Sequence, residues 1–182
     1  MENPIIIDLG AGPNKFPGSF GADLNVRAGT DFVCNLEHPL PLKDNSVHEI
    51  HSAHVLEHIK NLVQLMEEIY RVCKHDAIVV ISVPYYTSRG AFTDPEHIRF
   101  YTEYTFQKFE PPTYGIDCNF RILSTEFSVV RSFRIYPKIV QKWCRRYLWN
   151  VVDDITVTMK VVKDESRKNV SSEFERPCPA WS

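Results

Sequence analysis

The sequence predicts an α/β fold built on a mostly parallel sheet, and three of its features indicate that class. An apolar run at 4–9 is closed by a glycine turn, a helical pattern occupies 61–74, and a continuous apolar run at 77–83 stops at Pro84. Alternation of strand, helix and apolar strand is typical of parallel strands joined by crossover connections. The 182 residues suit one domain, which at this size buries about 70% of its unfolded surface.

The first strand is rich in β-branched residues and ends in a tight turn, as a buried central strand does. The helix at 61–74 places Leu62, Leu65 and Ile69 on one face with charged residues opposite, a spacing that indicates core packing. The other expected elements are strands at 20–24, 31–35 and 47–52, a short helix near 103–109, strands at 120–130 and 155–162, and a helix at 137–150 between those two.

Composition narrows the classes of partner and location. Residues 1–162 are expected to form the domain, and the charged segment at 163–182 a loosely ordered tail. The net charge of −2 supplies no basic field, so no nucleic-acid partner is expected. Five scattered cysteines have no CxxC or zinc-knuckle spacing, which favours free thiols in a reducing cytoplasm. A cytoplasmic location is also expected because there is no secretory leader pattern and no apolar run that could span a bilayer.

The residues that carry chemistry begin after the first strand, where Asp8 precedes Gly10 and Gly12. Glycines at this edge of a parallel sheet let the backbone approach a nucleotide-like ligand, although a plain turn is the simpler alternative. Asp23 ends the next strand, where a carboxylate can accept hydrogen bonds from both ribose hydroxyls. The dinucleotide pattern G-x-G-x-x-G fails because Lys15 stands at its last position, which disfavours a pyrophosphate-binding protein.

Five motifs occur here in the order found in class I S-adenosylmethionine-dependent methyltransferases. They are Asp8-Leu9-Gly10-Ala11-Gly12, Gly21-Ala22-Asp23-Leu24-Asn25, Cys34-Asn35-Leu36, Leu40-Pro41-Leu42 before Asp44-Asn45-Ser46-Val47, and Ala53-His54-Val55-Leu56-Glu57-His58-Ile59. This series, in roughly the first half of the chain, resembles the small type 11 branch of that family. The resemblance implies a Rossmann-like sheet with an antiparallel final strand, a methyltransferase activity, and S-adenosyl-L-methionine as the cofactor.

The resemblance also implies a role for each matching residue. Asp8, Gly10, Ala11 and Gly12 would line the methionine moiety, Asp23 and Leu24 the ribose and adenine, Asn35 and Leu36 the adenine, and Ala53 and His54 the sulfonium region. Asn14 stands where the family has a third glycine. Only residues 13–19 separate the loop from the second strand, so the first crossover helix is expected to be shortened or absent.

Two histidines are the candidate catalytic residues. His97 lies in the loop after the apolar strand at 77–83, where a neutral imidazole could take a proton from a hydroxyl or amine. His58 follows Glu57 just before a helix, and local hydrogen bonding there is the simpler explanation for that pair. His54, Glu57 and His58 stand at the spacing i, i+3, i+4, and with His97 these imidazoles and this carboxylate could share one metal ion. No metal is expected, because His54 replaces the carboxylate that a hard cation favours.

The favoured acceptor is an oxygen or nitrogen nucleophile of a small metabolite or a saccharide. A non-catalytic nucleotide-binding or scaffold domain of the same fold stays open, and a short-chain reductase is less favoured because its Tyr-x-x-x-Lys spacing, here Tyr104 and Lys108, is permissive. The basic aromatic segment at 136–149 could contact an anionic membrane surface. A helix packed over the acceptor side of the site is the favoured interpretation of that segment.

Overall fold

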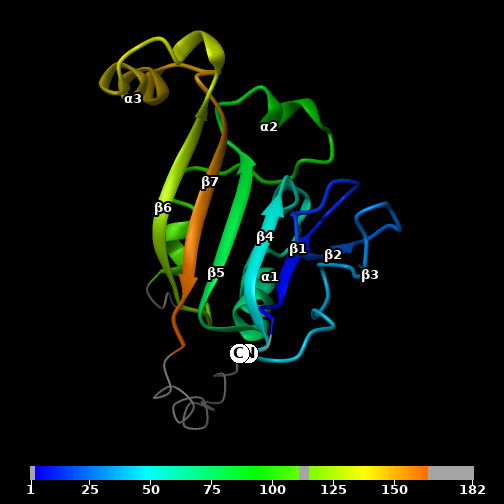
Figure 1. The fold of residues 1–182 in the computed structure, drawn as a ribbon. Coiled ribbons are helices and arrows are strands. Elements are labelled where there is room, and N and C mark those ends of the chain that lie inside the picture. Colours follow the sequence, from blue (N-terminus) through cyan, green and yellow to red (C-terminus); the bar gives the residue numbers. More distant parts are fainter. Residues whose placement is uncertain (1–2, 111–114, 164–182) are drawn as a thin grey trace, which may run out of the picture.

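The computed structural model describes residues 3–110 and 115–163 and joins seven strands in one sheet (Figure 1). The strands are β1 (Ile6–Leu9), β2 (Phe20–Asp23), β3 (Phe32–Val33), β4 (Val47–Ala53), β5 (Cys73–Pro84), β6 (Phe120–Val129) and β7 (Val152–Val161). Their order is β3-β2-β1-β4-β5-β7-β6, with β1 to β5 parallel and β7 antiparallel to both β5 and β6. The expected sheet with an antiparallel final strand is confirmed. Of the expected tail, 164–182 lies outside the described residues.

The helical elements are few and short. They are η1 (Leu56–His58), α1 (Leu62–Val72), α2 (Gly90–Thr93), η2 (Phe106–Phe109), η3 (Arg131–Phe133) and α3 (Lys138–Tyr147). Helix α1 begins after Asn61, whose side-chain oxygen accepts a hydrogen bond from the Gln64 amide at 3.2 Å. Such a cap satisfies one of the free amides of the first helical turn. The helix expected at 61–74 is therefore confirmed, and the one expected near 103–109 is reduced to η2.

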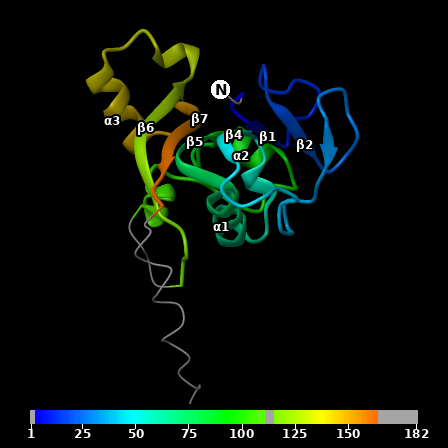
Figure 2. The ribbon, with the colours of Figure 1, turned by 60° about the horizontal axis from the view of Figure 1, so that its bottom comes forward.

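One face of the sheet forms the core. Ile7, Ile50 and Val79 lie side by side on β1, β4 and β5, and all three are buried. Helix α1 belongs to the same buried cluster and lies beneath the sheet in Figure 2. The paired residues Glu49 and Ile78 point to the opposite face and are only half-buried. The sheet thus packs its apolar face against α1 and leaves a mixed polar face opposite.

A loop replaces the first crossover helix, as expected from the short spacing. Among the described residues, no helix lies between β1 and β2 or between β2 and β3. The loop is held to the sheet by Phe16, whose backbone amide donates to Asp8 Oδ2 at 2.7 Å. The Phe16 ring stacks on the His51 imidazole with centroids 3.5 Å apart. One aromatic side chain therefore fixes a connection that a helix would otherwise make.

Helix α3 lies beyond the end of β6, at the end of the sheet where β4 and β5 also finish (Figure 1). Cys144 is its buried residue. Ile139, Trp143 and Tyr147, four residues apart along the helix, are 79%, 60% and 59% exposed. This stripe therefore faces solvent and not the sheet, contrary to the expected packing of the helix. Trp149, just after the helix, does approach the Phe92 ring, with centroids 5.9 Å apart.

The remaining expectations on thiols and membrane spans concern the described residues. Four cysteines there are free and buried, namely Cys34, Cys73, Cys118 and Cys144. None of the helices in the described ranges is both long enough and apolar enough to cross a bilayer.

Candidate functional site

The turn after β1 needs glycine for two separate reasons. Gly10 has φ +71° and Gly12 has φ +54°, a left-handed conformation that side chains disfavour. At Gly10 there is also no space, since a Cβ atom would lie 2.1 Å from Val55 Cγ2. Between them, Ala11 is buried and its amide donates to the Ala22 carbonyl at 3.2 Å. The loop is therefore fixed against both β2 and the segment after β4.

Asp23 connects this loop to the end of β2. Its Oδ2 accepts a hydrogen bond from the Gly12 amide at 3.0 Å, and its Oδ1 accepts one from the Asn25 amide at 2.9 Å. Each carboxylate oxygen has two lone pairs, so one acceptor site on each oxygen is left for a ligand hydroxyl. The loop after β1 and the carboxylate at the end of β2 are therefore joined at one edge of the sheet.

A second group of contacts holds the loop after β2 against the glycine turn. The Gly29 amide donates to the Gly12 carbonyl at 3.2 Å, and a Cβ on Gly21 would lie 2.0 Å from the Gly29 carbonyl oxygen. Asp31 Oδ2 accepts from the Gly21 amide at 2.7 Å and pairs with the Lys15 ammonium. That ammonium is the main reason why the pKa of Asp31 is lowered. Sequence analysis missed Gly21 and Gly29 as site residues, because contacts between two loops leave no local pattern.

The residues assigned to the adenine lie beside this edge. Leu24 is 61% exposed, so it offers an uncovered apolar surface next to Asp23. Asn35 is exposed, and its side-chain oxygen accepts from the Glu37 amide at 3.0 Å, which leaves its amide nitrogen as the free donor. Leu36 is half-buried and packs against the core.

Asp8 lies beneath the turn after β1 and is 7% exposed. Burial is the largest influence on its carboxyl and raises its pKa, while the hydrogen bond from the Phe16 amide acts in the opposite direction. The visible role of Asp8 is to hold the loop after β1.

At the end of β4, Ala53 is exposed and His54 turns the chain with φ +55°. The His54 ring lies between two carboxylates, with Nδ1 3.5 Å from Glu57 Oε1 and Nε2 3.8 Å from Asp154 Oδ1. Contact with Glu57 is the largest cause of a raised pKa at His54. Burial raises the pKa of Asp154, which comes from β7. His54 therefore connects the cofactor edge to the far half of the sheet.

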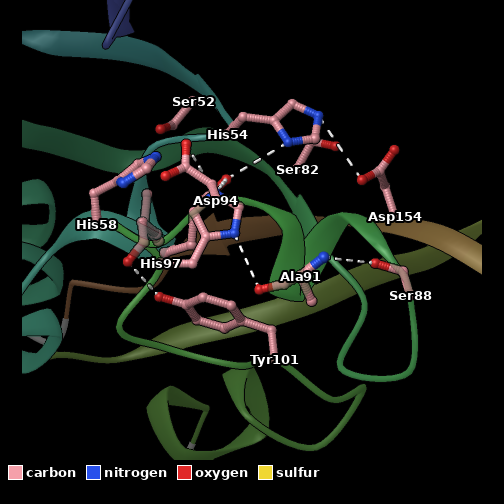
Figure 3. A network of polar contacts seen from close by, with 12 residues as sticks. Ser52, His54, His58, Ser82, Ser88, Ala91, Asp94, His97, Tyr101 and Asp154 are labelled. Carbon is pink, nitrogen blue, oxygen red and sulfur yellow. Dashed lines mark hydrogen bonds and ion pairs between the residues drawn. The ribbon is translucent and has the colours of Figure 1, made fainter.

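Glu57, His58 and His97 meet beside His54, as Figure 3 shows for the three histidines. Each offers one ligand atom, and these atoms lie within 4.8 Å of one another. The Glu57 carboxylate is 1% exposed, and neither of its oxygens accepts a hydrogen bond from the described residues. Hydrogen bonding at the helix N-terminus does not explain Glu57, because the cap of α1 is Asn61. The two candidate catalytic histidines thus share one cluster with a buried carboxylate, whose nearest ring contact is His54 Nδ1 at 3.5 Å.

Both imidazoles in that cluster are oriented by backbone carbonyls. His97 Nδ1 lies 3.2 Å from the Ala91 carbonyl oxygen, and His58 Nδ1 lies 3.2 Å from the Glu96 carbonyl oxygen. A carbonyl oxygen only accepts, so each Nδ1 carries the proton and each Nε2 keeps a lone pair when the ring is neutral. The cluster therefore presents two nitrogen lone pairs and a carboxylate to the same small space.

Comparisons with known proteins agree with this geometry. Residues 18–81 match a family model described as a methyltransferase domain. No curated protein sequence matches the chain.

Solved structures show the fold. YcgJ from Bacillus subtilis is 12% identical over 88% of this chain and 93% of its own, with a TM-score of 0.61. A SAM-dependent methyltransferase from Archaeoglobus fulgidus is 18% identical over 86% of each chain, with a TM-score of 0.58. A complex of the Haloferax volcanii Trm112 methyltransferase activator with a methyltransferase matches at 13% identity, 89% and 84% coverage, and a TM-score of 0.60.

The sheet differs from the strand order 3-2-1-4-5-6 of dinucleotide-binding sheets, because the antiparallel strand β7 lies between β5 and β6. This order and the loops at the carboxyl edge of the sheet define a class I methyltransferase fold. The match over 18–81 identifies a methyltransferase domain of the type 11 family in this part of the chain, and the solved structures show that the chain has the fold of S-adenosylmethionine-dependent methyltransferases. These comparisons support S-adenosylmethionine as the cofactor, and the short-chain reductase alternative is set aside.

Proposed function

We propose that this enzyme transfers the methyl group of S-adenosylmethionine to an oxygen or nitrogen of a small metabolite or a saccharide. The single observation that carries the proposal is the shared position of two groups at the carboxyl ends of parallel strands. The Gly12–Asp23 hydrogen bond lies after β1 and β2, and His54 with Glu57 lies after β4. Ligands of open α/β sheets bind in the crevice at this edge.

In this proposal the cofactor lies along the edge from β4 to β3. Asp8, Gly10, Ala11 and Gly12 surround the methionine moiety, Asp23 and Leu24 hold the ribose and adenine, Asn35 and Leu36 flank the adenine, and Ala53 and His54 face the sulfonium. Supporting contacts are the spare lone pairs on Asp23 and the 61% exposure of Leu24, which give one polar and one apolar surface for an adenosine.

His97 and His58 are the proposed catalytic residues. The Nε2 lone pair of His97, left by the Nδ1 contact to Ala91, is suited to accept the proton that the acceptor loses. A sulfonium is already an activated methyl donor, so positioning of the acceptor accounts for much of the rate. We therefore expect loss of His97 to lower turnover more than it lowers cofactor affinity.

The acceptor side is formed by aromatic rings next to the histidines. Phe92 stacks on Phe100 with centroids 4.6 Å apart and approaches Trp149 at 5.9 Å. All three rings are about half exposed or more, at 54%, 48% and 62%. Phe92 directly follows Ala91, the residue that orients His97. A ring-containing small molecule or a sugar suits such a platform, because small-ligand sites combine apolar walls with a few placed polar groups.

We also propose that the enzyme works in the cytoplasm. The buried free thiols of Cys34, Cys73, Cys118 and Cys144 support this location. Unpaired cysteines are usual where the compartment is reducing.

Incubation with cofactor labelled in its methyl group tests the proposal. Cell extract is divided into small molecules, saccharides, proteins and nucleic acids, and label is expected in the small-molecule or saccharide fraction. Asp23→Ala serves as the matched inactive variant. Binding of the cofactor with no label in any fraction would favour the non-catalytic scaffold, and label in protein or nucleic acid would overturn the proposed acceptor class.

A further inference from the structure

We propose that Glu57, His58 and His97 bind a divalent transition-metal ion, with Zn²⁺ as the best-suited ion. The site lies beside the proposed sulfonium position and is separate from the residues assigned to the cofactor's methionine and ribose. The ion's role in the reaction rests on the proposed methyl transfer, whereas the binding of the ion does not.

The first argument is the buried carboxylate of Glu57. It is 1% exposed and accepts no hydrogen bond from the described residues. Its nearest side-chain contacts are two histidine rings at longer range, His54 Nδ1 at 3.5 Å and His97 Nε2 at 3.9 Å. A buried carboxylate is costly unless it is paired, hydrogen-bonded or bound to a metal. An ion between Glu57 and the two imidazoles removes that cost.

The second argument is the orientation of the histidines. Backbone carbonyls of Ala91 and Glu96 accept from Nδ1 of His97 and His58, so both Nε2 atoms are left as free ligand atoms. Metal-binding histidines are commonly fixed in this way, with the second ring nitrogen donating to a carbonyl or carboxylate. The His97 side chain is 9% exposed and its Nε2 lies 3.9 Å from Glu57 Oε1, and the half-buried His58 ring meets the His97 ring edge to face. Both rings therefore lie beside the same carboxylate.

The distances fit after small side-chain rotations. The three ligand atoms lie within 4.8 Å of one another, whereas ligands about 2.0–2.2 Å from a tetrahedral zinc lie about 3.3–3.5 Å apart. The His58 and His97 rings already meet edge to face with centroids 4.8 Å apart. Closure by roughly an ångström at each atom is within reach of χ2 and χ3 rotation.

The ligand types decide which ion fits. Two imidazoles and one carboxylate suit zinc and neighbouring transition metals, and catalytic zinc sites of this composition keep a position open for water or substrate. Magnesium prefers oxygen ligands. The expectation of no metal depended on His54 as a poor ligand for a hard cation. In the structure His54 is not part of the close cluster, and the remaining ligands, two imidazoles and one carboxylate, suit a transition metal better than a hard cation.

The open coordination position has a use in the proposed reaction. An acceptor hydroxyl on the ion would have a lowered pKa. Its oxygen forms the new bond to the methyl carbon, and the carbon–sulfur bond breaks with its electron pair staying on sulfur. The hydroxyl proton leaves to solvent, because the His97 Nε2 lone pair that would accept it in the metal-free enzyme is then bound to the ion. Solvent reaches this side, because the His54 side chain is 55% exposed.

Calorimetry on the full chain, stripped with a chelator, tests the site with ZnCl₂, MnCl₂ and MgCl₂. One equivalent of Zn²⁺ is expected to bind with micromolar or tighter affinity, and Mg²⁺ far more weakly. Glu57→Gln and His97→Ala are expected to weaken Zn²⁺ binding at least 100-fold. The exposed His38, away from the cluster, supplies the control His38→Ala, which should bind as the parent does.

Substitution with Co²⁺ gives a second readout, the visible absorption of a cobalt bound by nitrogen and oxygen. Circular dichroism checks folding, and His97→Gln replaces His97→Ala if the latter unfolds. No Zn²⁺ binding by the folded parent, or equal binding by all variants, would overturn the site. Binding of S-adenosylhomocysteine is measured on the same samples. If the protein binds Zn²⁺ but not S-adenosylhomocysteine, the result counts against the proposed function alone. If it binds S-adenosylhomocysteine but not Zn²⁺, the result counts against the metal site alone.

Discussion

The backbone amide of Gly12 donates a hydrogen bond to Asp23 Oδ2 at 3.0 Å, across a separation of eleven residues. This contact joins the loop after β1 to the end of β2. In the proposed site these two segments hold the methionine and ribose parts of one ligand. A change at either residue should therefore affect both parts, because the glycine turn depends on the carboxylate for its position.

Replacement of Asp23 by alanine should weaken binding of S-adenosylhomocysteine by about 2–3 kcal/mol, since hydrogen bonds to a charged group are the stronger kind. That loss corresponds to roughly 30- to 150-fold in Kd. Glu126→Ala is the control, because it removes an exposed carboxylate on β6 and should leave the affinity unchanged. Calorimetry that finds equal affinity in Asp23→Ala and the parent would remove Asp23 from the site.

Gly10→Ala should lower both stability and cofactor affinity, because the added Cβ meets Val55 Cγ2 at 2.1 Å in a residue with φ +71°. Gly18 separates the two causes, since it has φ +80° with open space around it. Gly18→Ala should cost only the conformational strain, about 1 kcal/mol. Adding Val55→Ala to Gly10→Ala should restore part of the loss. Urea unfolding measures the parent, Gly10→Ala, Gly18→Ala and the Gly10→Ala/Val55→Ala double variant. An equal loss of unfolding free energy in Gly10→Ala and Gly18→Ala would contradict the steric argument.

Much of the fold could be predicted from sequence because it depends on local patterns. Periodicity predicted the helix with Leu65 and Ile69 on one face, and a continuous apolar run predicted the strand at 77–83. The absence of the first crossover helix followed from the short spacing at 13–19. Helix α3 was placed correctly but its packing was not. Its stripe of Ile139, Trp143 and Tyr147 has the spacing of a buried face, and spacing alone does not show whether a partner surface lies opposite.

The site was predictable only where its residues are close in sequence. The candidates Gly12 and Asp23 followed from the ends of successive strands, and the structure connects them directly. Gly29 had no signal, because its role depends on a contact with Gly12 across two loops. The proton positions on His58 depend on the Glu96 carbonyl, which lies 38 residues away and could not be located from the sequence.

Acid should destabilise the protein partly through Glu68. Arg71 donates to both of its oxygens, at 2.8 and 2.7 Å, and this contact is the main cause of a pKa below the ordinary 4.5. A lowered carboxyl pKa contributes stability that is complete above the ordinary value and is lost as pH falls through the lowered one. Glu68→Gln should therefore lose about 1 kcal/mol at neutral pH and show less acid dependence.

Urea unfolding at about pH 6.5 and about pH 3.5 measures this difference. The exposed Glu126 on β6 supplies the control Glu126→Gln, which should change neither stability nor its pH dependence by a comparable amount. A Glu68→Gln protein with the same loss on acidification as the parent would show that other groups dominate.

Glu57 should be destabilising in the metal-free protein. Its carboxylate is buried without a hydrogen bond, so Glu57→Met, which keeps the volume and removes the charge, should raise the unfolding free energy by about 1–2 kcal/mol after chelation. Glu103→Met is the matched control and should be destabilising, because that carboxylate accepts from the Tyr85 hydroxyl at 2.8 Å. Zn²⁺ should then stabilise the parent and leave Glu57→Met unchanged. Destabilisation of the chelated Glu57→Met protein would mean that contacts with His54 and His97 already compensate the buried charge, and that the carboxylate has a structural role.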